Sequence, residues 1–301
     1  MPIVRAPHVN TPPFSTKGQL IPVPWDGTSA LTRVCPAACN VSMSLVKYVV
    51  RDGVAVITLN RPAQRNAVNG ALTAELEAAV DRLEGDPEVT VGILTATINE
   101  GSRPTFCAGH DLSTMGGPED GIVTERGGFA GLVKRQRDKP LIAAVDGLAT
   151  AGGCELVLAC DIVVASERAS FALPEAKWNL VAGGGGIFRL TRIVGKPVAM
   201  DILLTCGELP AERAYQLGLV SRLVRSGSVD DAAMGVAREI RLNGPLAVRL
   251  TRRAAAAAEF IDDKQAWEMC QEVSAEILAS ADVREGLSAF AEKRLPKFSG
   301  R

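Results

Sequence analysis

The sequence predicts an α/β fold, because short apolar runs alternate along the chain with longer segments of helical periodicity. Apolar runs at residues 46–50 and 54–59 predict two strands, and Asp52 and Gly53 between them suit a tight hairpin turn. Residues 72–83 place apolar side chains at spacings of three and four, which predicts a helix. Hydrophobic residues make up 47% of the 301 residues, enough to build a buried core.

The alternation continues to about residue 225, and the chain beyond it is helical. Further buried strands are expected at residues 91–96, 141–145, 162–165 and 220–224. Further helices are expected at residues 152–160, 184–195, 209–218, 230–242, 245–258, 264–280 and 282–292. The sequence therefore predicts an α/β core over residues 43–225 and a helical C-terminal region over residues 226–301.

Residues 1–42 differ from the rest of the chain in composition. They hold seven of the 17 prolines and show no helical or strand periodicity, which predicts an extended, poorly ordered segment. So many prolines exclude the amphipathic helix of a transit peptide, and the segment lacks the apolar stretch of a secretory signal. Two interpretations stay open: an extension without function, such as one read from an upstream start codon, or a tail that binds a partner.

Composition excludes several classes of function. A net charge of −1 and 4% aromatic residues argue against a nucleic-acid-binding surface. No stretch approaches the roughly 20 apolar residues of a membrane span. Seven irregularly spaced cysteines and two histidines do not suggest a disulfide framework or a zinc site. We therefore expect a cytoplasmic protein that binds no metal, nucleic acid or membrane.

The first stretch with possible chemistry is Cys-Ala-Gly-His-Asp-Leu at residues 107–112. Gly109 permits a turn that exposes the backbone N–H groups after it. The alternative is a simple turn into a helix, capped by Asp111. Nothing near His110 in the sequence is expected to form a catalytic dyad with it.

The second stretch covers residues 149–160, where Gly152 and Gly153 open a predicted helix. Free N–H groups and the positive end of the helix dipole face whatever lies there. Glu155 falls in the first turn among apolar residues, so it is expected to hold a proton more readily than a free glutamate. It suits a general base or acid, and the alternative is favourable placement of an acid at a helix start. Cys154 is a weaker candidate nucleophile, because no histidine is placed to activate it.

The third stretch holds Glu175 and, shortly after it, four glycines at residues 183–186. Glu175 is either a solvated loop acid or part of a site. The glycine run lacks the Gly-Lys-Ser/Thr ending of a phosphate loop. We interpret it as close backbone packing beside a pocket.

Together these stretches resemble the enoyl-CoA hydratase/isomerase (crotonase) superfamily. The resemblance spans residues 46–301, and residues 1–42 lie outside it. Its motifs occur in order at residues 59–62, 107–112, 139–147, 152–156, 159–162, 174–175, 207 and 285–294. Residues 127–131 and 171–177 also look like the carnitinyl-CoA dehydratase branch.

The resemblance implies a crotonase-like spiral of ββα units with a helical C-terminal trimerisation region. It implies self-association as a homotrimer or homohexamer. The substrate would be an acyl thioester of coenzyme A, with no other cofactor and no metal. Lys293 and Phe290 match positions where a neighbouring subunit contacts coenzyme A in related enzymes.

The resemblance also assigns the site residues. The backbone N–H groups of His110 and Gly152 fall on the two oxyanion-hole positions, and Glu155 and Glu175 fall on the two catalytic glutamates. The resemblance further implies a set of substrate-binding residues: Ala108, Asp111, Leu112 and Gly183. Trp178 and the glycine-rich loop at residues 113–128 are expected to shape the acyl pocket.

The implied function is an enoyl-CoA hydratase of fatty acid metabolism, which adds water across the 2,3 double bond of a 2-enoyl-CoA to give 3-hydroxyacyl-CoA. Both glutamates are present, which favours hydration over a double-bond shift. The alternatives are a crotonobetainyl-CoA hydratase, an enoyl-CoA isomerase, and a degenerate member that binds acyl-CoA without turnover. Departures from the common pattern at His110, Ala151, Ala182, Ile187 and Phe188 leave the acyl preference open.

Overall fold

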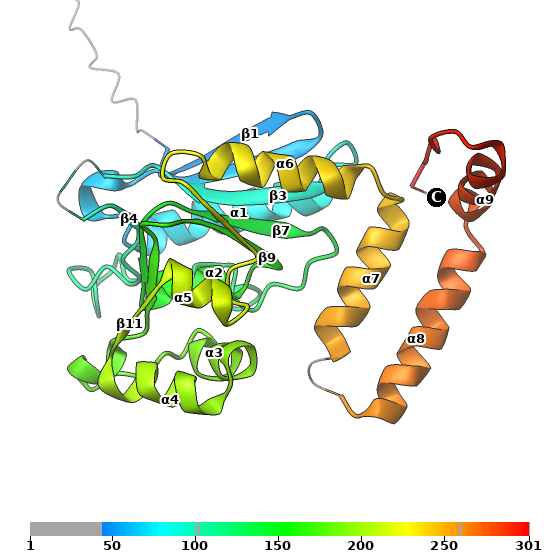
Figure 1. The fold of residues 1–301 in the computed structure, drawn as a ribbon. Coiled ribbons are helices and arrows are strands. Elements are labelled where there is room, and N and C mark those ends of the chain that lie inside the picture. Colours follow the sequence, from blue (N-terminus) through cyan, green and yellow to red (C-terminus); the bar gives the residue numbers. More distant parts are fainter. Residues whose placement is uncertain (1–43, 100, 102, 259–260, 301) are drawn as a thin grey trace, which may run out of the picture. The chain divides into compact units, whose positions relative to one another are not determined.

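A six-stranded sheet forms the centre of the fold (Figure 1). Its strands, in spatial order, are β1 (Val46–Arg51), β2 (Val54–Leu59), β3 (Val91–Ala96), β7 (Leu141–Val145), β9 (Ile162–Ser166) and β12 (Arg222–Val224). β1 and β2 form an antiparallel hairpin, and the remaining neighbours are parallel. All six predicted strands are confirmed, with ends within two residues of those expected.

The computed structural model describes residues 44–99, 101, 103–258 and 261–300. The chain divides into two units, residues 1–42 and 43–301. The extension predicted for residues 1–42 lies outside the described residues. The boundary expected near residue 225 falls between β12 and the next helix and stays a prediction.

A second, smaller sheet lies beside the first. Its strands, in order, are β11 (Glu208–Pro210), β10 (Ser170–Ala172), β8 (Leu148–Thr150) and β4 (Thr105–Cys107). β4, β8 and β10 are parallel, and β11 is antiparallel to β10. A pair of two-residue strands, β5 (Val123–Thr124) and β6 (Gly128–Phe129), forms a separate hairpin. The strands of the small sheet and of this hairpin are too short to show a periodic pattern, so the sequence does not predict them.

Helices follow most strands, and each predicted helix is confirmed with ends within two residues. They are α1 (Gly70–Gly85), α2 (Gly152–Leu158), α3 (Gly186–Val194), α4 (Lys196–Thr205), α5 (Ala211–Gln216), α6 (Val229–Arg241), α7 (Pro245–Ala258), α8 (Asp263–Leu278) and α9 (Ala281–Glu292). Two 3₁₀ turns complete the set, η1 (Pro62–Gln64) and η2 (Glu175–Trp178). Residues 209–210, expected to start a helix, belong to β11, and α5 begins directly after them.

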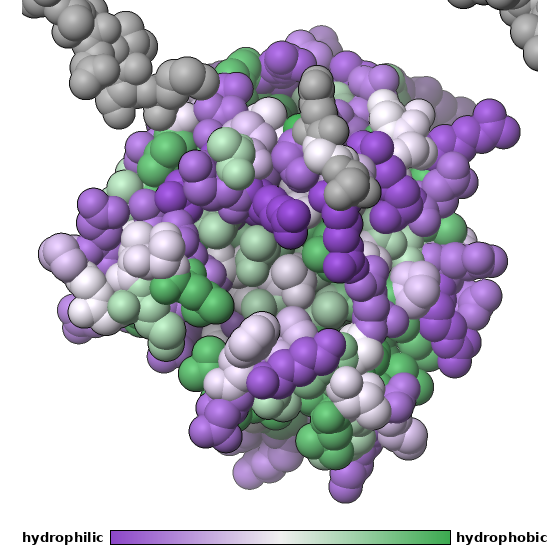
Figure 2. Space-filling model, turned by 90° about the vertical axis from the view of Figure 1, so that its left-hand side faces the viewer, coloured by the Kyte–Doolittle hydropathy of each residue, from purple (hydrophilic) through white to green (hydrophobic). Residues whose placement is uncertain are grey.

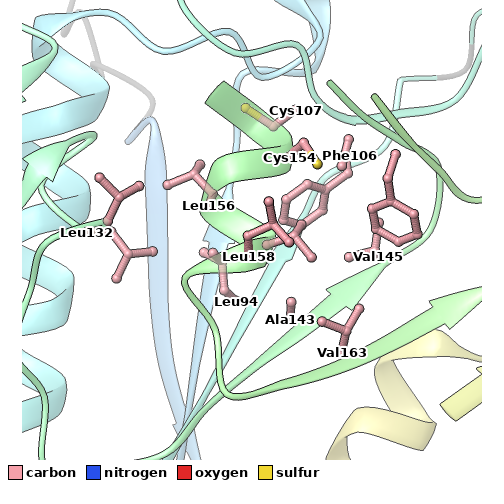
Figure 3. Close-up of a cluster of buried hydrophobic side chains, with 14 of the residues drawn as sticks. Leu94, Phe106, Cys107, Leu132, Ala143, Val145, Cys154, Leu156, Leu158 and Val163 are labelled. Carbon is pink, nitrogen blue, oxygen red and sulfur yellow. The ribbon is translucent and has the colours of Figure 1, made fainter. Parts of the chain in front are cut away.

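The central strands of the main sheet are buried on both faces. On β3, Leu94 faces a cluster shared with α1, α2 and the small sheet, whereas Ile93 faces a second cluster built with α6. Alternate residues of a strand point to opposite faces, so one apolar strand serves both clusters. Figure 3 shows part of the first cluster, where Cys154 and Leu158 of α2 lie beside Phe106 of β4, and Leu156 lies on the other side of the helix, toward Leu132. This packing fixes α2 and β4 against the main sheet.

The last three helices stand beyond the edge of the sheet (Figure 1). Arg252 of α7 contacts Asp161 at 2.9 Å and also donates to the backbone carbonyl of Arg137. The buried guanidinium of Arg137 pairs with the same carboxylate at 3.0 Å. Burial alone raises the pKa of Asp161, but Arg137 and Arg252 hold it below its usual range. This partly buried ion-pair network attaches α7 to the rest of the fold.

Within the described ranges, no helix has the length and apolar character needed to cross a bilayer. The same residues hold no group of three or more His, Cys, Asp or Glu side chains suited to a metal ion.

Replacing Gly235 by alanine is expected to stabilise the fold. Gly235 lies in the middle of α6, and a Cβ there would meet nothing within 4 Å. Alanine is favoured over glycine in a helix interior by about 0.5–1 kcal/mol. Urea unfolding should show this gain for Gly235→Ala. Gly92→Ala is the opposing control: its Cβ would lie 2.7 Å from Leu83 Cδ2, so a loss of stability is expected. Equal effects of the two substitutions would contradict this description of the packing.

Candidate active site

The three stretches that the sequence singles out each leave the same edge of the small sheet. Residues 107–112 follow β4, residues 151–155 follow β8, and residues 173–175 follow β10. These strands are parallel neighbours, so their carboxyl ends lie side by side. The fold therefore brings together three segments that are far apart in the sequence.

Two backbone N–H groups lie close together at this edge. Val68 donates to the Gly109 carbonyl at 2.7 Å and accepts from the Asp111 N–H at 2.8 Å. This parallel pairing leaves the N–H of His110, between them, directed away from Val68. Gly109 adopts φ 83°, and a Cβ on it would lie 2.8 Å from the Gly152 nitrogen. The turn at His110 and the start of α2 are therefore in close contact.

Gly152 is the first residue of α2, where backbone N–H groups have no partner within the helix. Ala151 before it adopts φ 50°, a left-handed conformation that favours glycine. Its N–H donates to the Ala172 carbonyl of β10 at 2.9 Å, and this contact holds the strained residue in place. The start of α2 is thus fixed directly to the strand that leads to Glu175.

Glu155 is almost fully buried, with 4% of its surface exposed. Its Oε1 accepts the Gly186 N–H at 2.9 Å, and a Cβ on Gly184 would lie 2.5 Å from its Oε2. The close backbone packing predicted for the glycine run is confirmed, and its partner is this carboxylate. Burial raises the pKa of Glu155, while the N–H groups of Gly186 and Gly184 and the charge of Arg189 offset part of that rise.

Glu175 opens η2 and is partly buried, so it is not the solvated loop acid that the sequence left open. Its Oε2 is buried and has no hydrogen-bond partner among the described residues. Burial raises the pKa of Glu175 to about 7, and the negative charge of Glu155 raises it as well. The structure therefore brings the two carboxyl groups close enough to interact and gives both a raised proton affinity.

The expectation that His110 has no dyad partner is wrong. Its Nε2 lies 2.7 Å from Asp120 Oδ1, and Asp120 Oδ2 accepts the Gly116 N–H at 2.8 Å. The Gly116 N–H and the imidazole hold the pKa of Asp120 below its usual range. The partner lies ten residues further along a loop that folds back on His110. Gly116 and Gly117 between them were the only sequence signal for this reversal.

The other predicted site residues differ in accessibility. Asp111 pairs with Arg61 at 2.5 Å and accepts the Ser113 hydroxyl at 2.6 Å, so its carboxylate stabilises the turn. Leu112 is exposed and Ala108 is partly exposed. The space beside Gly183 is open, because a Cβ built on it would have only the Val181 carbonyl oxygen within 4 Å, at 3.9 Å. Their contacts with a substrate stay predictions.

One face of the molecule has an apolar hollow. In Figure 2, small and apolar residues in white and green fill its centre, and hydrophilic residues in purple surround it. β4 and β11 of the small sheet lie toward this side in Figure 1. Exposed apolar side chains that follow β4 or β10 are Leu112, Met115, Trp178, Leu180 and Val181. Apolar hollows with polar borders are typical of small-molecule sites.

Comparison with known families covers nearly all of the described fold. The sequence model of the enoyl-CoA hydratase/isomerase family matches residues 50–301. The chain belongs to the enoyl-CoA hydratase/isomerase family. The resemblance inferred from the motifs is therefore confirmed.

Curated relatives of this family member carry hydratase and dehydratase names. Enoyl-CoA hydratase EchA19 of Mycobacterium tuberculosis is 37% identical over 252 residues, covering 82% of this chain and 93% of that protein. A carnitinyl-CoA dehydratase of Salmonella paratyphi A is 35% identical over 266 residues, covering 86% and 100%.

The solved structures of the family share the fold. An enoyl-CoA hydratase from Mycobacterium tuberculosis superimposes with a TM-score of 0.81 at 42% identity, covering 86% of this chain and all of that one. A carnitinyl-CoA hydratase from Mycobacterium avium gives a TM-score of 0.67 at 39% identity, covering 86% and 99%. The predicted crotonase-like α/β fold with a helical C-terminal region is confirmed.

Glu175→Gln is expected to stabilise this family member at alkaline pH. The pKa of Glu175 rises from 4.5 to about 7 on folding, so its ionised form destabilises the fold. The wild type therefore loses stability as pH rises through 4.5 toward 7, whereas neutral glutamine avoids that loss. The melting-temperature difference between variant and wild type should be near zero at about pH 4 and largest above about pH 8. Exposed Glu88→Gln is the control, and a pH-independent difference for Glu175→Gln would contradict the burial of this carboxyl.

Proposed function

We propose that this protein is an enoyl-CoA hydratase that adds water across the 2,3 double bond of a 2-enoyl-CoA to give 3-hydroxyacyl-CoA. The similar proteins named enoyl-CoA hydratase support the proposal. The observation that carries it is the pairing of two interacting carboxyl groups, those of the buried Glu155 and the partly buried Glu175. They lie at the same sheet edge as the neighbouring N–H groups of His110 and Gly152.

The two N–H groups are the proposed site for the thioester oxygen. Addition of water at carbon 3 places negative charge on this oxygen through the conjugated system. Fixed donors stabilise that charge without reorganising, and one such donor typically contributes about 3–4 kcal/mol. The His110 donor belongs to the backbone, so the unusual side chain at this position does not remove it.

The two glutamates divide the proton transfers. Glu155 accepts a proton from the water whose oxygen bonds to carbon 3, and the double-bond electrons move toward carbon 2 and the thioester oxygen. Glu175 then donates its proton to carbon 2. Its raised pKa of about 7 supports this role, because a substantial fraction is protonated at neutral pH. The reaction consumes only the thioester and water, so we propose no further cofactor.

Glu155→Gln and Glu175→Gln should each abolish most hydration. Each change removes a proton acceptor or donor while keeping the size of the side chain. Such groups typically raise the reaction rate about 10²–10⁴-fold. The measurement is loss of the conjugated enoyl-thioester absorbance with crotonyl-CoA, longer homologues and crotonobetainyl-CoA.

Coenzyme A thioester binding should persist in both variants, and Glu88→Gln, an exposed glutamate outside the site, should turn over at the wild-type rate. Full activity of either active-site variant would remove that residue from the mechanism. Binding without turnover in the wild type, across the whole substrate panel, would favour an acyl-CoA-binding protein.

We also propose that the chain self-associates as a trimer or hexamer through its C-terminal helices. Large apolar side chains there are exposed in the single chain: Trp267, Leu278, Leu287, Phe290 and Leu295. Exposed apolar groups gathered in one region are typical of association surfaces.

Light scattering after gel filtration should give the mass of three or six chains. A charged substitution such as Leu287→Glu should lower this mass. A monomer at micromolar concentration would contradict the proposal.

A cytoplasmic location is the remaining part of the proposal. The five cysteines of the described residues, Cys107, Cys154, Cys160, Cys206 and Cys270, form no disulfide. Burial raises the pKa of Cys107 to about 12, which keeps its thiol protonated and unreactive. Unpaired thiols are usual in reducing compartments.

A further inference from the structure

The ring of Phe129 fills the space where a side chain of residue 152 would lie. A Cβ built on Gly152 would fall 2.5 Å from Phe129 Cε1 and 3.2 Å from its Cε2. The distance to Cε1 is shorter than real Cβ atoms show in their contacts. In a helix the Cα–Cβ bond tilts toward the N-terminus. The ring edge therefore borders the space in front of α2, into which the Gly152 N–H also points.

The backbone around Phe129 restricts the ring to this position. Gly128, Ala130 and Gly131 adopt φ 68°, 54° and 68°. Gly131 leaves no room for a side chain, because its Cβ would lie 2.5 Å from Glu77 Cβ of α1. A non-glycine residue such as Ala130 keeps a left-handed conformation only where the surrounding structure enforces it.

Polar contacts attach this loop to α1. Thr124 of β5 donates to Glu77 Oε1 at 2.8 Å and accepts the Gly127 N–H at 2.9 Å. Asp81 of α1 pairs with Arg126 at 2.6 Å and with Arg135 at 2.5 Å, one on each side of Phe129 in the sequence. The position of the ring is thus set by α1, outside the site.

We propose that Phe129 is a specificity-determining residue that restricts the site to enoyl thioesters unbranched at carbon 2. The inference rests on the proposed function, because it places the thioester oxygen on the Gly152 N–H. An oxygen there lies about 2.9 Å from the nitrogen, which is about 1.5 Å from the Cα whose Cβ position the ring occupies. Carbon 2 is two bonds from that oxygen, so a methyl group on it meets the ring edge, whereas an unbranched carbon 2 does not.

The kinetic test compares Phe129→Leu with the wild type on 2-butenoyl-CoA and 2-methyl-2-butenoyl-CoA. Leucine keeps an apolar side chain and removes the ring edge. The ratio of kcat/KM for the branched over the straight substrate should rise about ten-fold or more, since one methyl group in an apolar pocket changes this ratio roughly 10–200-fold. Phe129→Met, close to the wild-type volume but unbranched and flexible, is the second variant if Phe129→Leu fails to fold.

Phe106→Leu is the matched control, because it removes a fully buried ring from β4 in the same core cluster. It should lower stability and leave the substrate ratio unchanged. A ratio that rises equally in the Phe106 and Phe129 variants overturns the inference, since loosened packing would then be the cause.

A double-mutant cycle tests the contact without any substrate. Gly152→Ala should lower the melting temperature because its Cβ overlaps the ring, and Phe129→Leu should restore part of the loss in that background. Additive losses of melting temperature overturn the contact and the inference with it.

The kinetic outcomes separate this inference from the proposed function. If the wild type hydrates 2-butenoyl-CoA but Phe129→Leu keeps the wild-type ratio, this inference is overturned and the proposed function stands. If the wild type hydrates no enoyl-CoA, both are overturned.

Discussion

The site depends on the parallel alignment of three very short strands, β4, β8 and β10. Each contributes three residues, and each is followed at once by a segment with a functional candidate: His110, Gly152 or Glu175. Such a small sheet holds few ladder hydrogen bonds, and its side chains are buried in one core cluster with those of α2 and the main sheet. A shift of one residue in this alignment would turn every following side chain toward the opposite face. The packing of the core and the geometry of the site therefore depend on the same strand alignment.

Backbone groups, more than side chains, define the environment of the two acids. Glu155 is held by glycine N–H groups that approach only because no Cβ intervenes at Gly184 and Gly186. Glu175 has a buried oxygen, Oε2, that accepts no hydrogen bond in the part of the chain that the structure describes, and it interacts with the charge of Glu155. Glu155 accepts N–H groups of the glycine run, whereas Glu175 accepts, among the described residues, only its own backbone N–H, so two chemically identical groups differ in proton affinity. That difference is what acid and base chemistry at a single water requires.

Periodicity was sufficient for the long elements and failed for the short ones. All six strands of the main sheet and the helices after residue 225 could be predicted, and all of them except the three-residue β12 have enough residues for a pattern to repeat. Glu155 and Glu175 could be singled out because an acid among apolar residues is conspicuous. The small sheet, the contact of His110 with Asp120 and the Phe129 ring on Gly152 could not be predicted. Each depends on backbone reversals and non-local packing that the local sequence does not encode.

Gly152 and Glu155 lie three residues apart in the first turn of the same helix. Helical geometry places their backbones about 4.5 Å apart along the axis, and neither can move without the other. In the proposed reaction this rise sets the spacing between the group that meets the carbonyl oxygen and the group that activates water, and the covalent distance from the carbonyl group to carbon 3 is the same in every conjugated thioester. The groups on α2 therefore do not distinguish acyl chains of different length. Selectivity among acyl chains must arise in the loops and helices around α2.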